Sequence, residues 1–260
     1  MNIQEIKAGT LTTRVYPDRQ TLGEDAACIA ATKLRNLLNE KEEINILFAA
    51  APSQNEFLAA LQTYNLPWER INALHMDEYI GLKADAPQRF GNFLKEHIFA
   101  TKPFKSIHYL HKEGETPEAI CKYYEETLHQ YPIDVVFMGI GENGHIAFND
   151  PHVALFDDPQ SVKTVSLDEV CRMQQVHDDC FHCLEEVPQQ AVTVTIPVIM
   201  KAKYLLCMVP GRQKANAIKE TLYGSVSTAC PASILRTHPQ AILFCDQDSA
   251  SLLSVKSKKV

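Results

Sequence analysis

Short apolar segments alternate along the chain with longer segments in which apolar residues recur every three or four positions. The short segments are mostly continuous in hydrophobicity, which is typical of strands covered on both faces. We expect strands at residues 44–50, 71–76, 134–138, 192–196, 204–209 and 241–245. The longer periodic segments predict helices at residues 21–39, 55–64, 90–98, 117–130, 197–201 and 213–222.

The alternation of strand and helix predicts an α/β fold with a largely parallel, twisted sheet and right-handed crossovers. Helices should cover both faces of this sheet, because most of its strands are continuous in hydrophobicity rather than alternating. The 260 residues contain no Pro-, Gly- or Ser-rich spacer and no repeat of solenoid length. We therefore expect a single domain over residues 1–260.

Charge and composition narrow the possible partners. The formal net charge is −7 and the pI is about 5.8, which disfavours nucleic acid and anionic membranes as partners because both need clustered Lys and Arg. A small anion is still allowed, since a phosphate needs only a few donors in one place. Residues 1–15 lack the apolar segment of a signal peptide, and no run of about 18 apolar residues occurs. We expect a soluble, cytoplasmic protein.

The eight cysteines indicate reduced residues rather than a disulfide framework, since several fall within apolar segments of a long chain. One segment, the His/Cys segment, places His177, Cys180, His182 and Cys183 within seven residues. A second ligand pair, which a structural zinc site usually has, is missing. We therefore expect no metal site there, and at most adventitious binding.

The most informative segment is a predicted buried strand that runs directly into a glycine-rich turn, residues 133–151. Three glycines within six residues allow the backbone to turn sharply and to approach a ligand closely. His145 supplies a proton carrier and Asp150 a carboxylate, at the end of a strand where parallel sheets place their chemistry. We interpret the turn as an active-site loop; the alternative is a strand-to-helix turn whose histidine caps or packs.

Polar side chains follow three other predicted strands, and the carboxyl ends of parallel strands share one edge of a sheet. These side chains are Ser53, Asp77 with Glu78, and Lys214. In an extended segment Asp77 and Glu78 point to opposite sides, so only one enters a cleft, where one carboxylate suffices as a general base. Ser53 can cap a helix or bind an anion, and Lys214 can supply a point charge to a phosphate. Each residue alone is common on surfaces, so the prediction is that they converge.

Three segments carry recognisable motifs: Met-Asp-Glu-Tyr-Ile-Gly-Leu at residues 76–82, Gly-His-Ile-Ala-Phe-Asn-Asp-Pro at 144–151, and Gly-Arg-Gln-Lys-Ala at 211–215. Together they resemble the glucosamine-6-phosphate deaminase (isomerase) family, and the likeness extends over nearly the whole chain. The first two motifs distinguish the chain from the related 6-phosphogluconolactonases, which usually have Asp-Glu-Arg and Asp-Gly-His-Thr-Ala-Ser there.

The resemblance implies a Rossmann-like α/β fold and an enzyme of amino sugar metabolism. This enzyme would convert an amino-sugar 6-phosphate and water into a ketose 6-phosphate and ammonia, without a cofactor. By the same resemblance, His145 opens the pyranose ring, oriented by Asn143 and Asp150, and Asp77 moves a proton from C2 to C1 through an enediol-type intermediate. The partner is a small sugar phosphate, and a homo-oligomer is possible because family members occur as monomers and as larger assemblies.

Two residues depart from the family near the histidine. Asn143 stands where relatives have Asp or Asn, so it can hydrogen-bond His145 but cannot accept a proton as a carboxylate does. Asp150 stands where the family usually has Glu, and we expect the shorter side chain to reach His145 by a backbone shift or through a water.

The phosphate end departs further. The family's usual Thr-Gly-Gly-Thr or Ser-Gly-Gly-Thr loop is Ala-Ala-Pro-Ser at residues 50–53, which keeps only the Ser53 hydroxyl. The family arginine that contacts phosphate aligns near Gln175, which leaves Arg172 about one helical turn away as a substitute. We expect Ser53, Arg172 and Lys214 to bind the substrate of a divergent sugar-phosphate deaminase or isomerase.

Two other functions stay open on the sequence alone. A 6-phosphogluconolactonase-like hydrolase, or an isomerase of another sugar phosphate, could use the same histidine and carboxylate. A non-catalytic sugar-phosphate sensor would also explain the altered phosphate loop and Asn143. The sequence does not distinguish the gluco from the galacto configuration of the substrate.

Overall fold

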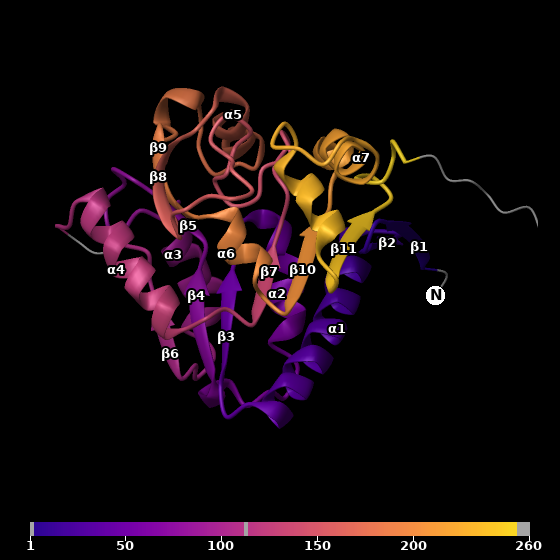
Figure 1. Cartoon of the computed structure of the whole chain (residues 1–260), viewed down its shortest axis with the longest axis horizontal. Helices are drawn as coiled ribbons and strands as arrows, with labels where there is room; N and C mark the ends of the chain where they lie inside the picture. The colour runs from indigo at the N-terminus through magenta and orange to yellow at the C-terminus, as the bar shows by residue number, and fades with distance from the viewer. Residues whose placement is uncertain (1–2, 112–113, 254–260) are drawn as a thin grey trace, which may run out of the picture.

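The computed structural model describes residues 3–111 and 114–253, and its centre is an eight-stranded sheet in the order β1-β2-β11-β10-β7-β3-β4-β6 (Figure 1). The first pair is antiparallel and all other neighbours are parallel. These strands are β1 Gln4–Ala8, β2 Leu11–Tyr16, β3 Ile44–Phe48, β4 Ile71–His75, β6 Ser106–His108, β7 Val135–Met138, β10 Tyr204–Val209 and β11 Ala241–Asp246.

A second, three-stranded antiparallel sheet lies beyond the carboxyl ends of the parallel strands, together with helix α5 (Figure 1). Its strands, in order, are β5 Asp77–Tyr79, β9 Gln190–Val194 and β8 Val162–Ser166. The helices are α1 Arg19–Glu40, α2 Asn55–Leu61, α3 Phe90–Leu94, α4 Pro117–Gln130, α5 Glu169–His177, α6 Ile196–Met200 and α7 Ala215–Tyr223. None of the helices in the described part of the chain is both long and apolar enough to cross a bilayer.

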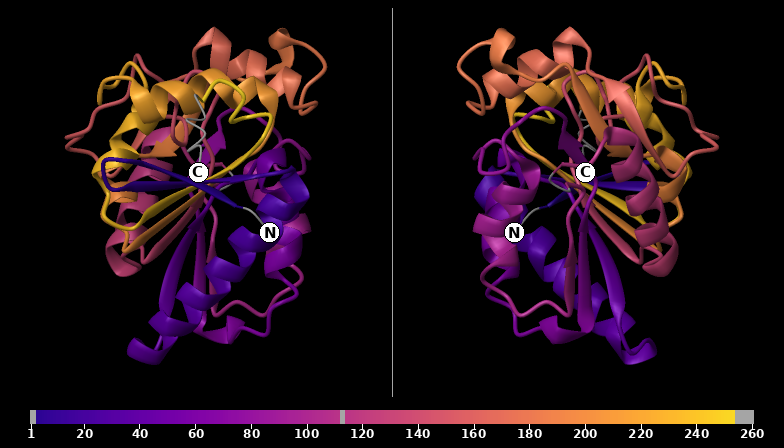
Figure 2. Two further views of the ribbon diagram at one scale, coloured as in Figure 1. Left: turned by 90° about the vertical axis from the view of Figure 1, so that its right-hand side faces the viewer. Right: turned by 90° about the vertical axis from the view of Figure 1, so that its left-hand side faces the viewer.

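Helices cover both faces of the large sheet, as the sequence predicts (Figure 2). Because side chains alternate along a strand, each central strand contributes to two cores. On one face, Phe48 and Phe137 pack in a cluster with apolar residues of α1, α2 and α3. On the other face, Leu47, Val136 and Met138 belong to a second cluster with residues of α4, α6 and α7. The continuous apolar strands are therefore buried on both sides, and the α/β, largely parallel architecture is confirmed.

Local sequence signals explain where the main helices begin. The Asp18 carboxylate accepts a hydrogen bond from the amide of Thr21 at 2.8 Å and caps α1. Thr116 caps α4, and Pro117 occupies its first turn, where its missing amide hydrogen costs nothing. Asp168 caps α5 by accepting from the amide of Cys171 at 2.6 Å. Asp168 also contacts two residues of the functional site described below, Asn143 and Asp150.

The predicted strands and helices are all present, with ends that differ by up to a few residues. The strand predicted at 192–196 is β9, but it lies in the small antiparallel sheet and does not join the parallel one. The reason is that the chain leaves β4 and pairs at once with β9, so that the carbonyl of Met76 accepts from the amide of Val194 at 2.8 Å. The sequence patterns did not predict the β1–β2 hairpin, the short strands β5, β6 and β8, or helix α5.

Candidate active site

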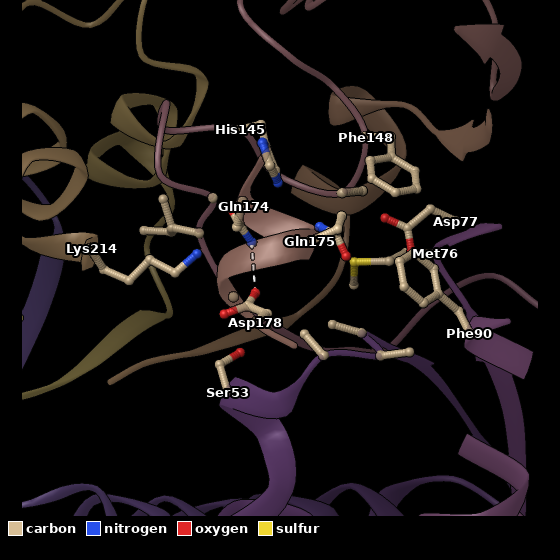
Figure 3. A pocket seen from close by; sticks show the side chains of 17 residues that line it. Ser53, Met76, Asp77, Phe90, His145, Phe148, Gln174, Gln175, Asp178 and Lys214 are labelled. Atoms are coloured by element: carbon tan, nitrogen blue, oxygen red, sulfur yellow. Dashed lines mark hydrogen bonds between the residues drawn. The ribbon is translucent and has the colours of Figure 1, made fainter. Parts of the chain in front are cut away.

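A cleft opens at the carboxyl ends of the parallel strands, between the large sheet and the small sheet (Figure 3). Four of its lining residues were expected from the sequence, and each comes from a different segment. Ser53 follows β3, Asp77 begins β5, His145 lies in the loop after β7, and Lys214 follows β10. Figure 3 shows Ser53 and Lys214 toward one end of the cleft and Asp77 toward the other. The predicted convergence of these residues is therefore present.

His145 is held from one side by two acceptors. Its Nδ1 atom lies 2.8 Å from Asn143 Oδ1 and 3.0 Å from Asp150 Oδ1. The Asn143 amide nitrogen donates to Asp150 at 3.0 Å and to Asp168 at 2.9 Å, so the amide oxygen must face the histidine. Nδ1 therefore carries a hydrogen, and in the neutral ring Nε2 keeps the lone pair that can take a proton.

Asp150 is completely buried, yet its carboxylate is well satisfied. Burial alone would raise its pKa, but the hydrogen bond and charge of His145, the amide of Asn143 and the amide of Asp168 outweigh burial and hold the pKa below its ordinary value. Asp150 is thus ionised and stabilises a proton on His145. Of the two routes expected for Asp150 to reach His145, a bridging water is not needed, because the two side chains are in direct contact.

The backbone of the loop explains this direct contact. Gly144 and Ala147 have positive φ angles of 85° and 49°, which curl the chain between the strand and Asp150. The amide of Gly141 donates to the carbonyl of His145 at 3.0 Å and closes the turn. The Asn149 amide nitrogen donates to the carbonyls of Ile146 and of β9, at 3.0 and 2.9 Å. The loop is therefore closed on itself and pinned to the small sheet.

Asp77 faces the cleft, whereas Glu78 points to the opposite side of β5, as an extended segment requires. Burial raises the pKa of the Asp77 carboxyl well above its ordinary value, and the charge of Glu78 raises it further, with the Phe148 amide opposing. Glu78 instead accepts from the amides of Phe90 and Gly91, at 3.3 and 3.1 Å, at the start of α3. A buried carboxyl with a raised pKa can both take and return a proton near neutral pH.

His75, at the end of β4, holds the backbone of Asp77. The sequence did not indicate His75 as a site residue, because this histidine lies within a largely apolar strand. Its Nε2 atom accepts from the amide of Leu110 at 2.8 Å, so Nδ1 donates to the carbonyl of Asp77 at 3.0 Å. Burial lowers the pKa of His75 to about 4, which keeps the ring neutral in this role. The Tyr124 hydroxyl fixes the backbone of His75 by donating to its carbonyl at 2.7 Å.

Lys214 and Ser53 form the other end of the cleft. Lys214 is only 6% exposed, and the structure gives its ammonium group no hydrogen bond or ion pair with any described residue. Burial lowers its pKa, while the charges of Asp178 and Glu142 oppose this. Ser53 accepts a hydrogen bond from the side chain of Gln54 at 3.0 Å, which orients its hydroxyl. A buried, unpaired cation in a cleft is suited to bind an anionic group of a ligand.

Helix α5 and the residue that follows it add three polar residues to this end, Gln174, Gln175 and Asp178. The sequence indicated none of them as a site residue. The Gln174 side chain donates to Asp178 at 3.3 Å and accepts from the amide of Glu142 at 2.8 Å (Figure 3). Burial raises the pKa of Asp178, although the charge of Lys214 opposes this. Lys214 is the only lysine among the described residues that line the cleft, and the Asp178 carboxyl lies near it.

The structure does not bring Arg172 to the cleft. Its guanidinium donates to the carbonyl of Leu184 at 2.6 Å and to that of Val187 at 3.0 Å, on the loop that follows α5. Gln175, one turn further along, lines the cleft instead. Arg172 therefore does not take the place of the family arginine in the cleft. Its side chain instead fastens α5 to the loop that follows this helix.

Among the described residues, two groups of three possible metal ligands lie close enough to share an ion. One is His145 with Asp150 and Cys171, and the other is Asp150 with His152 and Asp168. Neither of these groups contains a member of the His/Cys segment.

Comparisons with known proteins show what the chain is similar to. A family model described as glucosamine-6-phosphate isomerases/6-phosphogluconolactonase matches residues 17–244. A protein of Listeria monocytogenes serotype 4a (strain HCC23), named glucosamine-6-phosphate deaminase, is 37% identical over 212 residues, which is 81% of this chain and 88% of the relative. One of Bacillus thuringiensis (strain Al Hakam), with the same name, is 34% identical over 221 residues, 85% of this chain and 82% of the relative.

Solved structures show the same fold. A monomeric glucosamine-6-phosphate deaminase superposes with a TM-score of 0.82 at 27% identity, covering 95% of this chain and all of that one. The 6-phosphogluconolactonase of Thermotoga maritima superposes with a TM-score of 0.74 at 20% identity, covering 91% of this chain and 99% of that one. The match of the family model over most of the chain and the identity to the relatives decide the assignment: the chain belongs to the family of glucosamine-6-phosphate isomerases and 6-phosphogluconolactonases.

Proposed function

We propose that the protein converts glucosamine 6-phosphate or galactosamine 6-phosphate and water into a ketose 6-phosphate and ammonia. The observation that carries this proposal is the placement of a carboxyl and an imidazole, Asp77 and His145, in one cleft whose other end holds the unpaired cation of Lys214. The names of the relatives support the same reaction. The cytoplasmic location and the single-domain organisation stay predictions within this proposal.

Ring opening is the first step, and His145 performs it. Nε2 accepts the proton of the anomeric hydroxyl and delivers a proton to the ring oxygen as the bond between C1 and that oxygen breaks. The product is the open-chain aldehyde. Asp150 stays ionised and stabilises the positive charge on the His145 imidazole during the transfer. Asn143 fixes the orientation of this imidazole.

Proton transfer between carbons is the second step, and Asp77 performs it. Its carboxylate removes the proton from C2, which gives an enediol-type intermediate, and the resulting carboxylic acid returns a proton to C1. C2 and the amino nitrogen then form an iminium group, and water adds to C2. Ammonia leaves, and the oxygen of the water becomes the ketone oxygen. Burial of Asp77 keeps the carboxyl basic enough to act in both directions.

Substrate binding falls to the opposite end of the cleft. Lys214 supplies a point charge, and Ser53 a hydroxyl, to the phosphate group. Gln175 supplies neutral hydrogen-bond donors where the family arginine aligns. Because Arg172 is tied to the loop after α5, it has no part in this proposal.

The test is ammonia release from the purified protein with each of the two amino-sugar phosphates, and acid release from 6-phosphogluconolactone as the alternative reaction. We expect ammonia from at least one sugar, a loss of at least about 10²-fold in His145→Gln, and unchanged rates in His129→Gln. His129 is an exposed residue near the end of α4 and serves as the matched control. Hydrolysis of the lactone without ammonia would favour the hydrolase, and tight sugar-phosphate binding without any turnover would favour the sensor.

A further inference from the structure

His145 sits next to two residues that can bind metal ions, and the proposed reaction uses only one of them. One ligand atom from each of His145, Asp150 and Cys171 lies within 4.8 Å of the other two, and all three residues are buried. We propose that this triad is a binding site for Zn²⁺ or a similarly soft divalent cation, and that its occupancy inhibits the enzyme. The inhibition rests on the proposed function, whereas the binding does not.

The geometry needs little adjustment. His145 Nδ1 and Asp150 Oδ1 are already 3.0 Å apart, and a tetrahedral zinc ion with ligands at about 2.0–2.3 Å holds them roughly 3–4 Å apart. Cys171 is fixed in the first turn of α5, because its amide donates to the capping carboxylate of Asp168 at 2.6 Å. The thiol lies within 4.8 Å of the other two ligand atoms. It therefore has to move by about 1–2 Å at most to complete a three-ligand site, and the fourth position remains for water.

Ligand chemistry and charge select the kind of ion. An imidazole, a carboxylate and a thiolate suit zinc and its neighbours in the transition series, whereas Mg²⁺ and Ca²⁺ prefer oxygen ligands only. Asp150 is completely buried and Asp168 lies against it, its amide donating to Asp150 at 3.2 Å, so negative charge is concentrated around the triad. The nearby group of Asp150, His152 and Asp168 lacks a sulfur ligand, and His152 is exposed.

Occupancy would stop proton transfer by a direct route. A metal on Nδ1 replaces the hydrogen that Asn143 and Asp150 now accept. The ion also takes up the Asp150 charge that stabilises protonated His145. With the metal on Nδ1, the neutral imidazole carries its single hydrogen on Nε2. Nε2 then has no lone pair for the proton of the anomeric hydroxyl, so ring opening is lost while the fold is retained.

The experiment titrates the purified, metal-free protein with Co²⁺ and measures the near-ultraviolet absorption that arises when a thiolate binds cobalt. The titration needs no substrate. We expect the band in the wild-type protein and its loss on addition of Zn²⁺. Cys171→Ser should abolish it, with Cys171→Ala as a second variant, whereas the double variant Cys180→Ser/Cys183→Ser, which removes the thiols of the His/Cys segment, should keep it. In parallel, we expect Zn²⁺ to inhibit ammonia release reversibly, and Cys171→Ser to weaken this inhibition roughly ten-fold or more.

Three results would overturn the site: no cobalt band in the wild-type protein, a band that persists in both Cys171 variants, or a band lost only in the double variant, which would place the ion on the His/Cys segment. The outcomes for the site and for the reaction are separable. A band that depends on Cys171 in a protein that releases no ammonia would retain the metal site and reject the deaminase. Ammonia release without any band would retain the deaminase and reject the site.

Discussion

Replacement of Gly141 by Ala should inactivate His145, although His145 itself is unchanged. A Cβ atom built on Gly141 would lie 2.1 Å from Cε1 of the His145 ring and 2.3 Å from each ring nitrogen. Because non-bonded carbon atoms settle at about 3.5–4.0 Å, the ring must retreat by more than about 1 Å. The backbone cannot yield easily, since the Gly141 amide holds the carbonyl of His145. The ring should therefore lose its contacts with Asn143 and Asp150.

A displacement of about 1 Å costs on the order of 10²-fold in rate, and complete loss of an acid-base group costs about 10²–10⁴-fold. We therefore expect Gly141→Ala to reduce ammonia release by at least about 10²-fold while its far-ultraviolet circular dichroism stays that of the wild type. The double variant Gly141→Ala/His145→Gln should be no slower than the slower single variant, because both changes act through one ring. A near-wild-type rate for Gly141→Ala, or losses that multiply in the double variant, would refute the reasoning.

Three further predictions follow from the buried charges. Asp77→Asn should abolish turnover yet raise the melting temperature at pH 7, because the raised pKa of Asp77 means that its ionised form costs folding free energy above the ordinary carboxyl pKa; a lower melting temperature would contradict this. The pKa of His75 is about 4 in the folded protein rather than 6.5, so below pH 6.5 the unfolded chain takes up a proton that the folded protein does not. Between pH 6.5 and pH 4 this should remove up to about 3 kcal/mol of unfolding free energy, measured by urea unfolding. The loss should be absent in His75→Gln. Lys214→Met should raise KM for the phosphosugar at least about ten-fold with a smaller change in kcat, and Asp178→Asn should lower KM. Changes in kcat as large as the changes in KM would show that neither residue acts in binding.

The parts of the fold that local pattern determines were predictable. Most of the central strands are runs made up largely of apolar residues, and α4 starts at the proline and ends at the residue that the periodicity indicates. Strand pairing is a tertiary choice, so the pattern of residues 192–196 could not say that β9 pairs with β5 and β8. The short strands β6 and β8 are only half-buried or mixed in polarity, which removes the apolar signal.

The same division holds in the site. Asp77, His145 and Lys214 were predictable because each follows an apolar strand, where a parallel sheet places its ligands. The direct contact between Asp150 and His145 depends on the left-handed backbone of Ala147, a residue type that gives no such signal. Arg172 was misplaced because spacing along a helix does not tell which carbonyls compete for a side chain.

The central claim is that the cleft performs an aldose-ketose conversion with loss of ammonia, using Asp77 as the base. The most direct test measures ammonia and ketose 6-phosphate together from one amino-sugar phosphate, in the wild-type protein and in Asp77→Asn, with sugar-phosphate binding measured for both by calorimetry. We expect equal amounts of the two products from the wild type, and neither from Asp77→Asn although it still binds. Ammonia released by Asp77→Asn at the wild-type rate, or a wild-type protein that binds and forms neither product, would contradict the account.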